Sequence, residues 1–183
     1  MNKDFIVTIT KKRFSPLQAT PEDIEIVDIA HALSLLCRAN GYVRHFYSVA
    51  QHCLNCAAEA KARGLSDDIQ LACLLHDASE AYISDITRPV KRSLPKYVEI
   101  EESLQKLIFE KYGLHHLDEA ELDEVRRIDD SLLYYELLDL LEEKIFEEPP
   151  EIVRKPDFEQ RDFLAVKEAF LAEFHRLADA RSR

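Results

Sequence analysis

The sequence predicts an all-α fold, a helical bundle with a short N-terminal extended arm or hairpin. Its 183 residues include only three glycines and no tryptophan. Leucine, alanine, glutamate and isoleucine are abundant, a composition that favours helix over sheet. Apolar residues also recur at helical spacing through most of the chain. The length suits a single domain over residues 1–183, with a core at about 21–146 and a C-terminal helix at about 157–178 that packs on it.

The N-terminal segment is expected to start extended and then turn helical. Residues 5–17 alternate β-branched side chains around a lysine pair, which indicates a short hairpin or arm. Thr20 then suits an N-cap, because a proline follows at the first helical position and acids fill the first turn. We expect this helix to run to about Ala39 and to end at Asn40-Gly41, a pair suited to a left-handed cap.

Two further helices follow from capping residues. Ser48 and Gln51 form the capping-box pattern S-x-x-Q, so a helix is expected from Val49 towards Lys61. Ser66 opens the next helix, whose run at 69–75 is apolar on nearly all sides. Such a helix belongs at the centre of a bundle. We therefore expect the adjacent His-Asp pair at 76–77 to lie inside this apolar helix, at its buried end.

The remaining helices are separated by prolines and a glycine. Residues 84–94 contain a helix-breaking proline and should form a loop over the end of the central helix. A helix at 95–112 stops at a glycine, and an aspartate-capped helix at 118–146 stops at a proline pair. The last helix, at 157–178, places aromatic and aliphatic residues along one stripe.

Charge and composition exclude several classes of function. The formal net charge is −11, and residues 118–148 hold 13 acidic and 3 basic side chains, so −10 of it lies there and −1 elsewhere. This acidity argues against a broad surface for a nucleic-acid polymer. There is no run of about 18 apolar residues and no signal-like start, so no membrane partner is expected. The chain is expected to be cytoplasmic.

The cysteines are interpreted as structural. Without an export signal they should be reduced thiols, and all of them fall within helical patterns. The CLNC sequence at 53–56 has the spacing of a zinc knuckle, but no second CxxC accompanies it. Small buried helix residues are the preferred reading of Cys37, Cys53, Cys56 and Cys73.

Two histidines and two acids are the candidate metal ligands. His76 and Asp77 are adjacent in an apolar helix, where an imidazole and a carboxylate are costly to bury unless something binds them. His52 lies in the first turns of another apolar helix, and Asp129 lies among apolar residues of the long acidic helix. This donor set suits one borderline or hard divalent ion with positions left open for water and substrate.

The ordered set His52, His76-Asp77, Asp129 resembles the H…HD…D signature of the HD-domain metal-dependent phosphohydrolases. The surrounding segments SVAQH at 48–52, LLHDASEAYISDITRPVK at 74–91 and VRRID at 125–129 are similar to the bacterial 5′-deoxynucleotidase branch and its phage dNTP-hydrolysing relatives. The resemblance covers about residues 21–146. It implies an HD-domain bundle and a single divalent ion, either Mn, Co, Fe, Zn or Mg.

The resemblance also implies roles for individual residues. It gives His52, His76, Asp77 and Asp129 as the metal ligands, with the adjacent Asp130 as an alternative to Asp129. The acid that acts on the attacking water corresponds to Glu80, and the acid that orients water or substrate corresponds to Asp85. Independently of the family, helical spacing puts Glu80 one turn beyond the His-Asp pair on the same face, where a carboxylate can accept a proton from water.

Basic residues near this centre are the candidate phosphate ligands. The resemblance assigns a phosphate-binding arginine to Arg38, with Arg44 as a possible substitute, and a guanidinium suits bidentate contact with phosphate. Thr87, Arg88 and Lys91 are further candidates for substrate binding. The alternative for Arg88 and Lys91 is that they only keep an exposed loop soluble.

These features lead to a hypothesis for the function. We expect a phosphohydrolase that removes phosphate from deoxyribonucleoside 5′-monophosphates by metal-activated water. Two alternatives remain: a deoxynucleoside triphosphate hydrolase with the same metal centre, and a nucleotide-binding HD module without turnover. The expected partner is a nucleotide, and a homodimer or higher homo-oligomer is possible; the base, the sugar and the native metal are left open.

Overall fold

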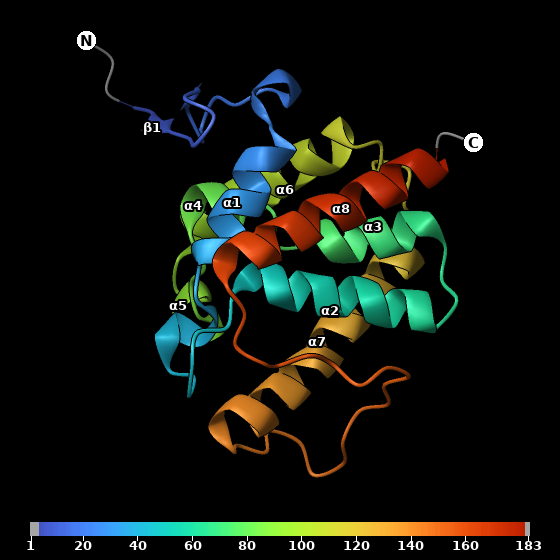
Figure 1. The fold of residues 1–183 in the computed structure, drawn as a ribbon. Coiled ribbons are helices and arrows are strands. Elements are labelled where there is room, and N and C mark those ends of the chain that lie inside the picture. The colour runs from blue at the N-terminus through green and yellow to red at the C-terminus, as the bar shows by residue number, and fades with distance from the viewer. Residues whose placement is uncertain (1–3, 182–183) are drawn as a thin grey trace.

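The computed structural model describes residues 4–181 and confirms a mostly helical fold with a small N-terminal hairpin (Figure 1). The elements follow one another as β1 Ile6–Val7, β2 Arg13–Phe14, η1 Pro21–Asp23, α1 Ile26–Leu35, η2 Arg38–Gly41, α2 Val49–Ala62, α3 Asp67–Leu75, α4 Glu80–Ile83, α5 Arg88–Lys91, α6 Pro95–Lys111, α7 Glu119–Leu141 and α8 Phe163–Arg181.

Helices α2 and α3 form the centre of the bundle. They are joined by a short turn and pack along their length, with α8 against one side of the pair and α7 against the other (Figure 1). The run predicted to be apolar all round is buried throughout α3. On α8, the predicted stripe contributes Val166, Phe170, Phe174 and Leu177 to the same core. This packing brings the N-terminal end of α2, the C-terminal end of α3 and the middle of α7 together.

The hairpin is attached to the bundle by polar and aromatic contacts. Its strands are antiparallel, with Ile6 opposite Phe14. The backbone N–H and the hydroxyl of Thr10 both donate to the carboxylate of Asp28 in α1, each at 2.9 Å. Phe14 is fully buried and stacks on Tyr82 with ring centroids 4.0 Å apart. The alternating pattern of the sequence therefore predicted a hairpin, and this hairpin packs against the bundle.

The predicted helix starts are confirmed where side-chain caps define them. Ser48 and Gln51 form the expected capping box at the start of α2, and Ser66 accepts from the backbone of Ile69 at the start of α3. Asp118 and Glu121 form the equivalent box before α7. A local hydrogen bond to a backbone N–H decides each of these positions, which is why the sequence locates them.

The first predicted helix, by contrast, is broken. The prediction of one helix from Thr20 to Ala39 is wrong at both ends, because Pro21–Asp23 form a 3₁₀ turn, α1 spans only Ile26–Leu35, and residues 38–41 form a separate 3₁₀ turn. Ala39 and Asn40 both have positive φ. The chain leaves the helix because the N–H of Arg38 donates to Tyr47 instead, within a short antiparallel pairing to the segment before α2. This break directs Arg38 towards the bundle end.

The helix expected to contain the His-Asp pair also ends early. Helix α3 stops at Leu75, His76 is its C-cap, and Asp77 lies in the turn before α4, so the prediction that the pair lies inside a helix is wrong. Tight backbone bonds from Ala78 to Leu75 and from Glu80 to Asp77 form this turn. The pair therefore lies at the open end of the central helix.

Three other boundaries differ from the prediction. The segment expected as a loop at 84–94 contains the short helix α5, while α7 stops at Leu141 instead of Phe146 because Glu142 adopts a left-handed conformation. Helix α8 begins at Phe163, later than 157, and the segment before it runs antiparallel alongside α2 and passes in front of α7 (Figure 1). No helix among residues 4–181 combines the length and apolar character required to cross a bilayer.

Candidate metal centre

The four predicted ligands converge from α2, from the end of α3 and from α7. The Nε2 atoms of His52 and His76 are 3.1 Å apart. Asp129 Oδ1 lies 3.1 Å from His52 Nε2 and 3.8 Å from His76 Nε2, and Asp77 Oδ2 lies 3.9 Å and 3.4 Å from the same two atoms. Ligands bonded to zinc at about 2.0–2.2 Å stand roughly 3.0–3.5 Å apart in octahedral or tetrahedral geometry. Three of the five separations fall in this range, and the other two, 3.8 Å and 3.9 Å, exceed it slightly, so the cluster is close to the spacing of ligands around one cation.

The hydrogen bonds of the two histidines orient their lone pairs towards that position. His76 Nδ1 is 2.8 Å from the carbonyl oxygen of Cys73, which can only accept, so this nitrogen carries the proton. His52 Nδ1 lies 2.5 Å from the carboxylate of Glu136 and donates to it. In each neutral ring the lone pair is then on Nε2. Two lone pairs that face each other repel unless a cation or a proton lies between them.

The electrostatics of the centre favour positive charge. Burial lowers the pKa of His76, but the neighbouring Asp77, Cys53 and Asp129 together raise it more, so the pKa is well above its usual value. Burial raises the pKa of Asp129, but its contacts with both imidazoles hold the pKa well below its usual value. Both effects arise because carboxylates surround the nitrogen pair, the environment that binds a divalent ion.

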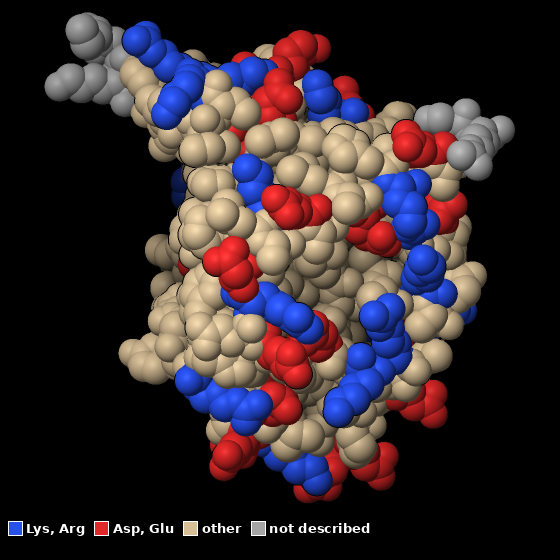
Figure 2. Space-filling model, in the orientation of Figure 1, with Lys and Arg blue, Asp and Glu red and all other residues tan. Residues whose placement is uncertain are grey.

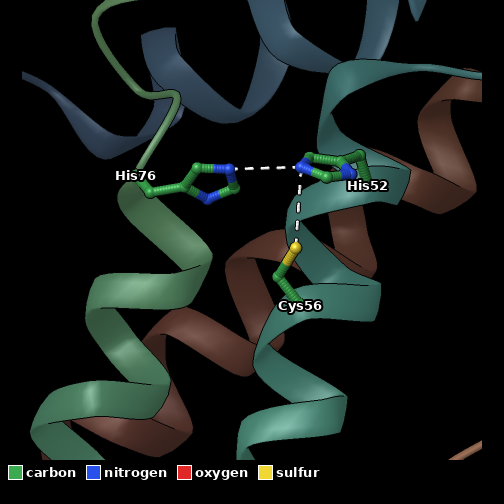
Figure 3. Close-up of side chains that lie close together, drawn as sticks. All are labelled: His52, Cys56 and His76. Carbon is green, nitrogen blue, oxygen red and sulfur yellow. Dashed lines mark hydrogen bonds between the residues drawn. The ribbon is translucent and has the colours of Figure 1, made fainter. Parts of the chain in front are cut away.

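Two thiols also approach the histidines. Cys56 Sγ lies 3.5 Å from His52 Nε2, and within residues 4–181 the sets His52–Cys56–His76 and Cys53–His76–Asp77 each place their ligand atoms within 4.8 Å (Figure 3). The cysteines are free thiols, and Cys53, Cys56 and Cys73 are buried in α2 and α3 as predicted. The prediction is wrong for Cys37, which is half-buried and extended and pairs with Ser48 in an antiparallel bridge. The position of Cys56, four residues after His52, was the signal that it shares the helix face of that histidine.

A cavity of about 440 Å³ opens beside the centre. The predicted site residues that line it are Arg38, Asp77, Glu80, Asp85, Thr87, Arg88, Lys91 and Asp129. Apolar side chains of α7 cover one end of it, including Leu133, Leu137 and Leu140. The cavity therefore joins a strongly polar end, next to the candidate ligands, to an apolar end.

Glu80 is the predicted proton acceptor and is buried in this cavity wall. Its residue is only 4% exposed, and its Oε2 has no hydrogen-bond partner among the described residues. Burial raises the pKa of Glu80 well above its usual value, and the charges of Asp77 and Asp85 raise it further. A buried carboxylate oxygen without a partner indicates a position reserved for water or a ligand.

The sequence left two pairs of alternatives, Arg38 or Arg44 for phosphate and Asp129 or Asp130 for the metal, and the members of each pair lie in different surroundings. Arg38 lies in the cavity, where its Nη1 is 3.4 Å from Asp77, whereas Arg44 is half-exposed outside the lining and pairs with Asp139 at 2.6 Å. Asp129 faces the histidines. Asp130 points outwards to Arg88, with 2.8 Å between their charged atoms.

Glu136 of α7 is a residue of this site that was not predicted from the sequence. It lies seven residues after Asp129, which is two helical turns along the same face, as the only acid in an otherwise apolar LLYYELL run. That spacing was the signal that an acid is buried beside the metal-binding position. Its residue is 4% exposed.

The outer surface differs from this polar interior. On the face shown in Figure 2, basic and acidic side chains are interspersed instead of forming a continuous basic field. The cations Arg38, Arg88 and Lys91 line the cavity together with acids of the candidate site, so opposite charges alternate there as well.

Fold and site together define a helical bundle with a buried histidine, cysteine and aspartate cluster able to hold a metal ion. No protein-family profile matches the chain. It is 44% identical over 110 residues to the uncharacterized protein YfdR of Escherichia coli (strain K12), covering 60% of this chain and 59% of that protein. It is 40% identical over 112 residues to the uncharacterized protein RCAP_rcc00048 of Rhodobacter capsulatus, covering 58% and 57%. The chain thus spans less than two thirds of the length of these relatives, whose names give no activity.

Proposed function

We propose that this chain is a metal-dependent phosphohydrolase that releases phosphate from deoxyribonucleoside 5′-monophosphates. One observation carries the proposal: the Nε2 atoms of His52 and His76 lie 3.1 Å apart and each lies within 3.9 Å of oxygens of Asp77 and Asp129, beside a cavity that Arg38 and Glu80 also line. The deoxynucleotide preference rests on the resemblance of the three sequence segments to the HD-domain 5′-deoxynucleotidases.

The donor set fits a divalent cation. Imidazole and carboxylate ligands suit Mn, Co, Fe, Zn or Mg to different degrees, and the two inner thiols would favour the softer of these ions. A bound cation of this kind supplies Lewis acidity, which makes water a stronger acid at neutral pH and neutralises charge on phosphoryl oxygens.

Glu80 is proposed to accept the proton from the attacking water. Glu80 lines the cavity, and its buried Oε2 has no hydrogen-bond partner among the described residues, so no other described group competes for it. Asp85 lines the same cavity and is proposed to orient water or substrate. Proton transfer to a positioned carboxylate contributes typically 10²–10⁴-fold to a rate.

The cations of the cavity are proposed to bind the phosphate. Arg38 is the most buried of them, and its planar guanidinium matches two phosphate oxygens. Arg88 and Lys91 lie at the rim and already pair with Asp129 and Glu101. These pairs hold two mobile side chains over the cavity, and Thr87 adds a hydroxyl donor beside them.

A substrate and metal screen tests this function. Purified chain is incubated with all common nucleoside mono-, di- and triphosphates in the presence of Mn²⁺, Co²⁺, Mg²⁺ or Zn²⁺, and released phosphate and nucleoside are quantified. We expect phosphate release from deoxyribonucleoside 5′-monophosphates, and none after Glu80→Ala. Preferential turnover of triphosphates would select the triphosphate hydrolase, and binding without turnover under every metal would select the nucleotide-binding module.

A further inference from the structure

Glu136 contacts both halves of the proposed site with its two carboxylate oxygens. Its Oε1 accepts from His52 Nδ1 at 2.5 Å and from the Tyr47 hydroxyl at 3.3 Å. Its Oε2 accepts from Arg38 Nη2 at 3.1 Å and from Arg38 Nε at 3.3 Å. One oxygen therefore orients a candidate metal ligand, and the other orients the candidate phosphate-binding arginine.

Arg38 extends this arrangement to a second candidate ligand. Its Nη1 lies 3.4 Å from Asp77 Oδ2, while Nη2 and Nε face Glu136. Glu136, His52, Asp77 and Arg38 thus surround the metal-binding position as a ring of contacts, in which each carboxylate faces a cation or an imidazole. Rotation of the arginine away from Glu136 would also remove its contact with Asp77.

Stability alone does not account for a carboxylate at this position. The Arg38–Glu136 pair is almost fully buried, with side chains 13% and 5% exposed. Burying two charges costs free energy that their attraction only partly returns, and replacing such pairs by apolar residues is often neutral or stabilising. The neighbours of Glu136 in α7 are leucines and tyrosines, so an apolar residue would continue the pattern.

We infer that Glu136 is a positioning residue that sets the metal-binding tautomer of His52 and the orientation of Arg38 at the same time. This inference rests on the proposed function and adds a residue to it. A carboxylate on the far nitrogen of a ligand histidine fixes the ring and raises its basicity, and loss of such a partner typically weakens metal affinity about 10–100-fold. Here the same loss should also weaken phosphate binding.

Two substitutions of Glu136 distinguish the effect of its hydrogen bonds from the effect of its side-chain volume. Glu136→Ala removes both contacts. Glu136→Gln keeps the shape but must turn its NH₂ group towards either His52 or Arg38, both of which are donors, so it loses one contact. Tyr47→Phe is the matched control, because it removes a third contact of the same carboxylate and leaves both His52 and Arg38 paired with it.

The test uses the full chain and two binding measurements. Co²⁺ is titrated into each variant and followed by its visible absorption, and inorganic phosphate is then titrated into the Co²⁺-loaded protein. We expect Glu136→Ala to lower Co²⁺ affinity roughly 10–100-fold and to weaken phosphate binding as well. Glu136→Gln should weaken at least one of the two, and Tyr47→Phe should retain both affinities and the cobalt spectrum.

The outcomes distinguish this inference from the proposed function. Wild-type affinities for both Co²⁺ and phosphate in Glu136→Ala overturn it, and loss of only one overturns the dual role. If Glu136→Ala does not fold, Glu136→Gln decides, because unchanged binding of both ligands there overturns the inference. Failure of the wild-type chain to bind Co²⁺ removes the proposed function itself.

Discussion

Two buried glutamates, Glu59 and Glu80, make opposite use of the same side chain. Glu59 in α2 is 1% exposed, and Glu80 at the start of α4 is 4% exposed. Glu59 accepts hydrogen bonds from the backbone of Val153 and Arg154 and from Arg63, each at 2.8 Å. Glu80 has an oxygen without a partner among residues 4–181. Burial is nearly equal, so it does not distinguish the two.

The difference lies in what surrounds each carboxylate. Burial raises the pKa of Glu59, but its hydrogen bonds from Arg63 and two backbone N–H groups lower the pKa below its usual value. Burial and two neighbouring carboxylates instead raise the pKa of Glu80. The satisfied carboxylate of Glu59 holds the segment that runs alongside α2, whereas the unsatisfied carboxylate of Glu80 beside two acids is costly to the fold, which makes Glu80 a candidate for a functional role.

The largest effect that sharpens this comparison is expected at Glu80. Glu80→Ala should lower kcat about 10²–10⁴-fold, because the proton acceptor is lost, while Co²⁺ binding persists. Kinetics with a deoxyribonucleoside monophosphate and a Co²⁺ titration measure both quantities. Glu59→Gln serves as the matched control and should keep kcat. Loss of Co²⁺ together with activity in Glu80→Ala would make Glu80 a metal ligand instead.

Adjacent aspartates in α7 provide the next test. Asp129→Ala should deplete the bound metal, because its carboxylate lies 3.1 Å from His52 Nε2, whereas Asp130→Ala removes only a surface contact with Arg88. Metal content after dialysis, measured by elemental analysis, compares the two variants. Equal retention in both would contradict the ligand assignment.

A smaller effect, on stability, is expected at Glu59. Glu59→Gln replaces one acceptor oxygen by an amide and leaves a part-buried backbone N–H of the segment alongside α2 without its charged partner, which costs about 1–3 kcal/mol of unfolding free energy. Urea denaturation of the two proteins at neutral pH measures the difference. A variant as stable as the wild type would show that this carboxylate does not fasten the segment.

The smallest effect is the pH dependence of that difference. Because the pKa of Glu59 is lower in the folded state than its usual value, its contribution is complete above the usual value and is lost as pH falls through the lowered value. The stability gap between wild type and Glu59→Gln should therefore shrink in acid. Urea denaturation repeated over a series of decreasing pH checks this, and a gap that widens in acid contradicts it.

Local features of the fold could be predicted from the sequence, and long-range ones could not. Ser48, Ser66 and Asp118 mark helix starts through hydrogen bonds to their own helices. Helix ends depended on distant partners: α1 ends at Leu35 because the chain pairs with the segment before α2, and α8 starts late because residues before it bond to side chains of α2. Such contacts have no signal in a local pattern.

The candidate site divides in the same way. Residue type and spacing gave the convergent set of two histidines and two aspartates, because an acid or imidazole in an apolar helix is conspicuous. The thiols of α2 were assigned to packing, since cysteine suits a buried helix face with or without a ligand nearby. Glu136 was overlooked, because its partners Arg38 and His52 lie in segments far from it in the sequence.

The most direct test of the metal centre is a crystal structure of the chain grown with Mn²⁺, with an anomalous difference map calculated at the manganese edge. We predict one peak about 2.0–2.2 Å from the Nε2 atoms of His52 and His76 and from oxygens of Asp77 and Asp129. A map without a peak among these four side chains, or with the ion bound elsewhere, would contradict the account.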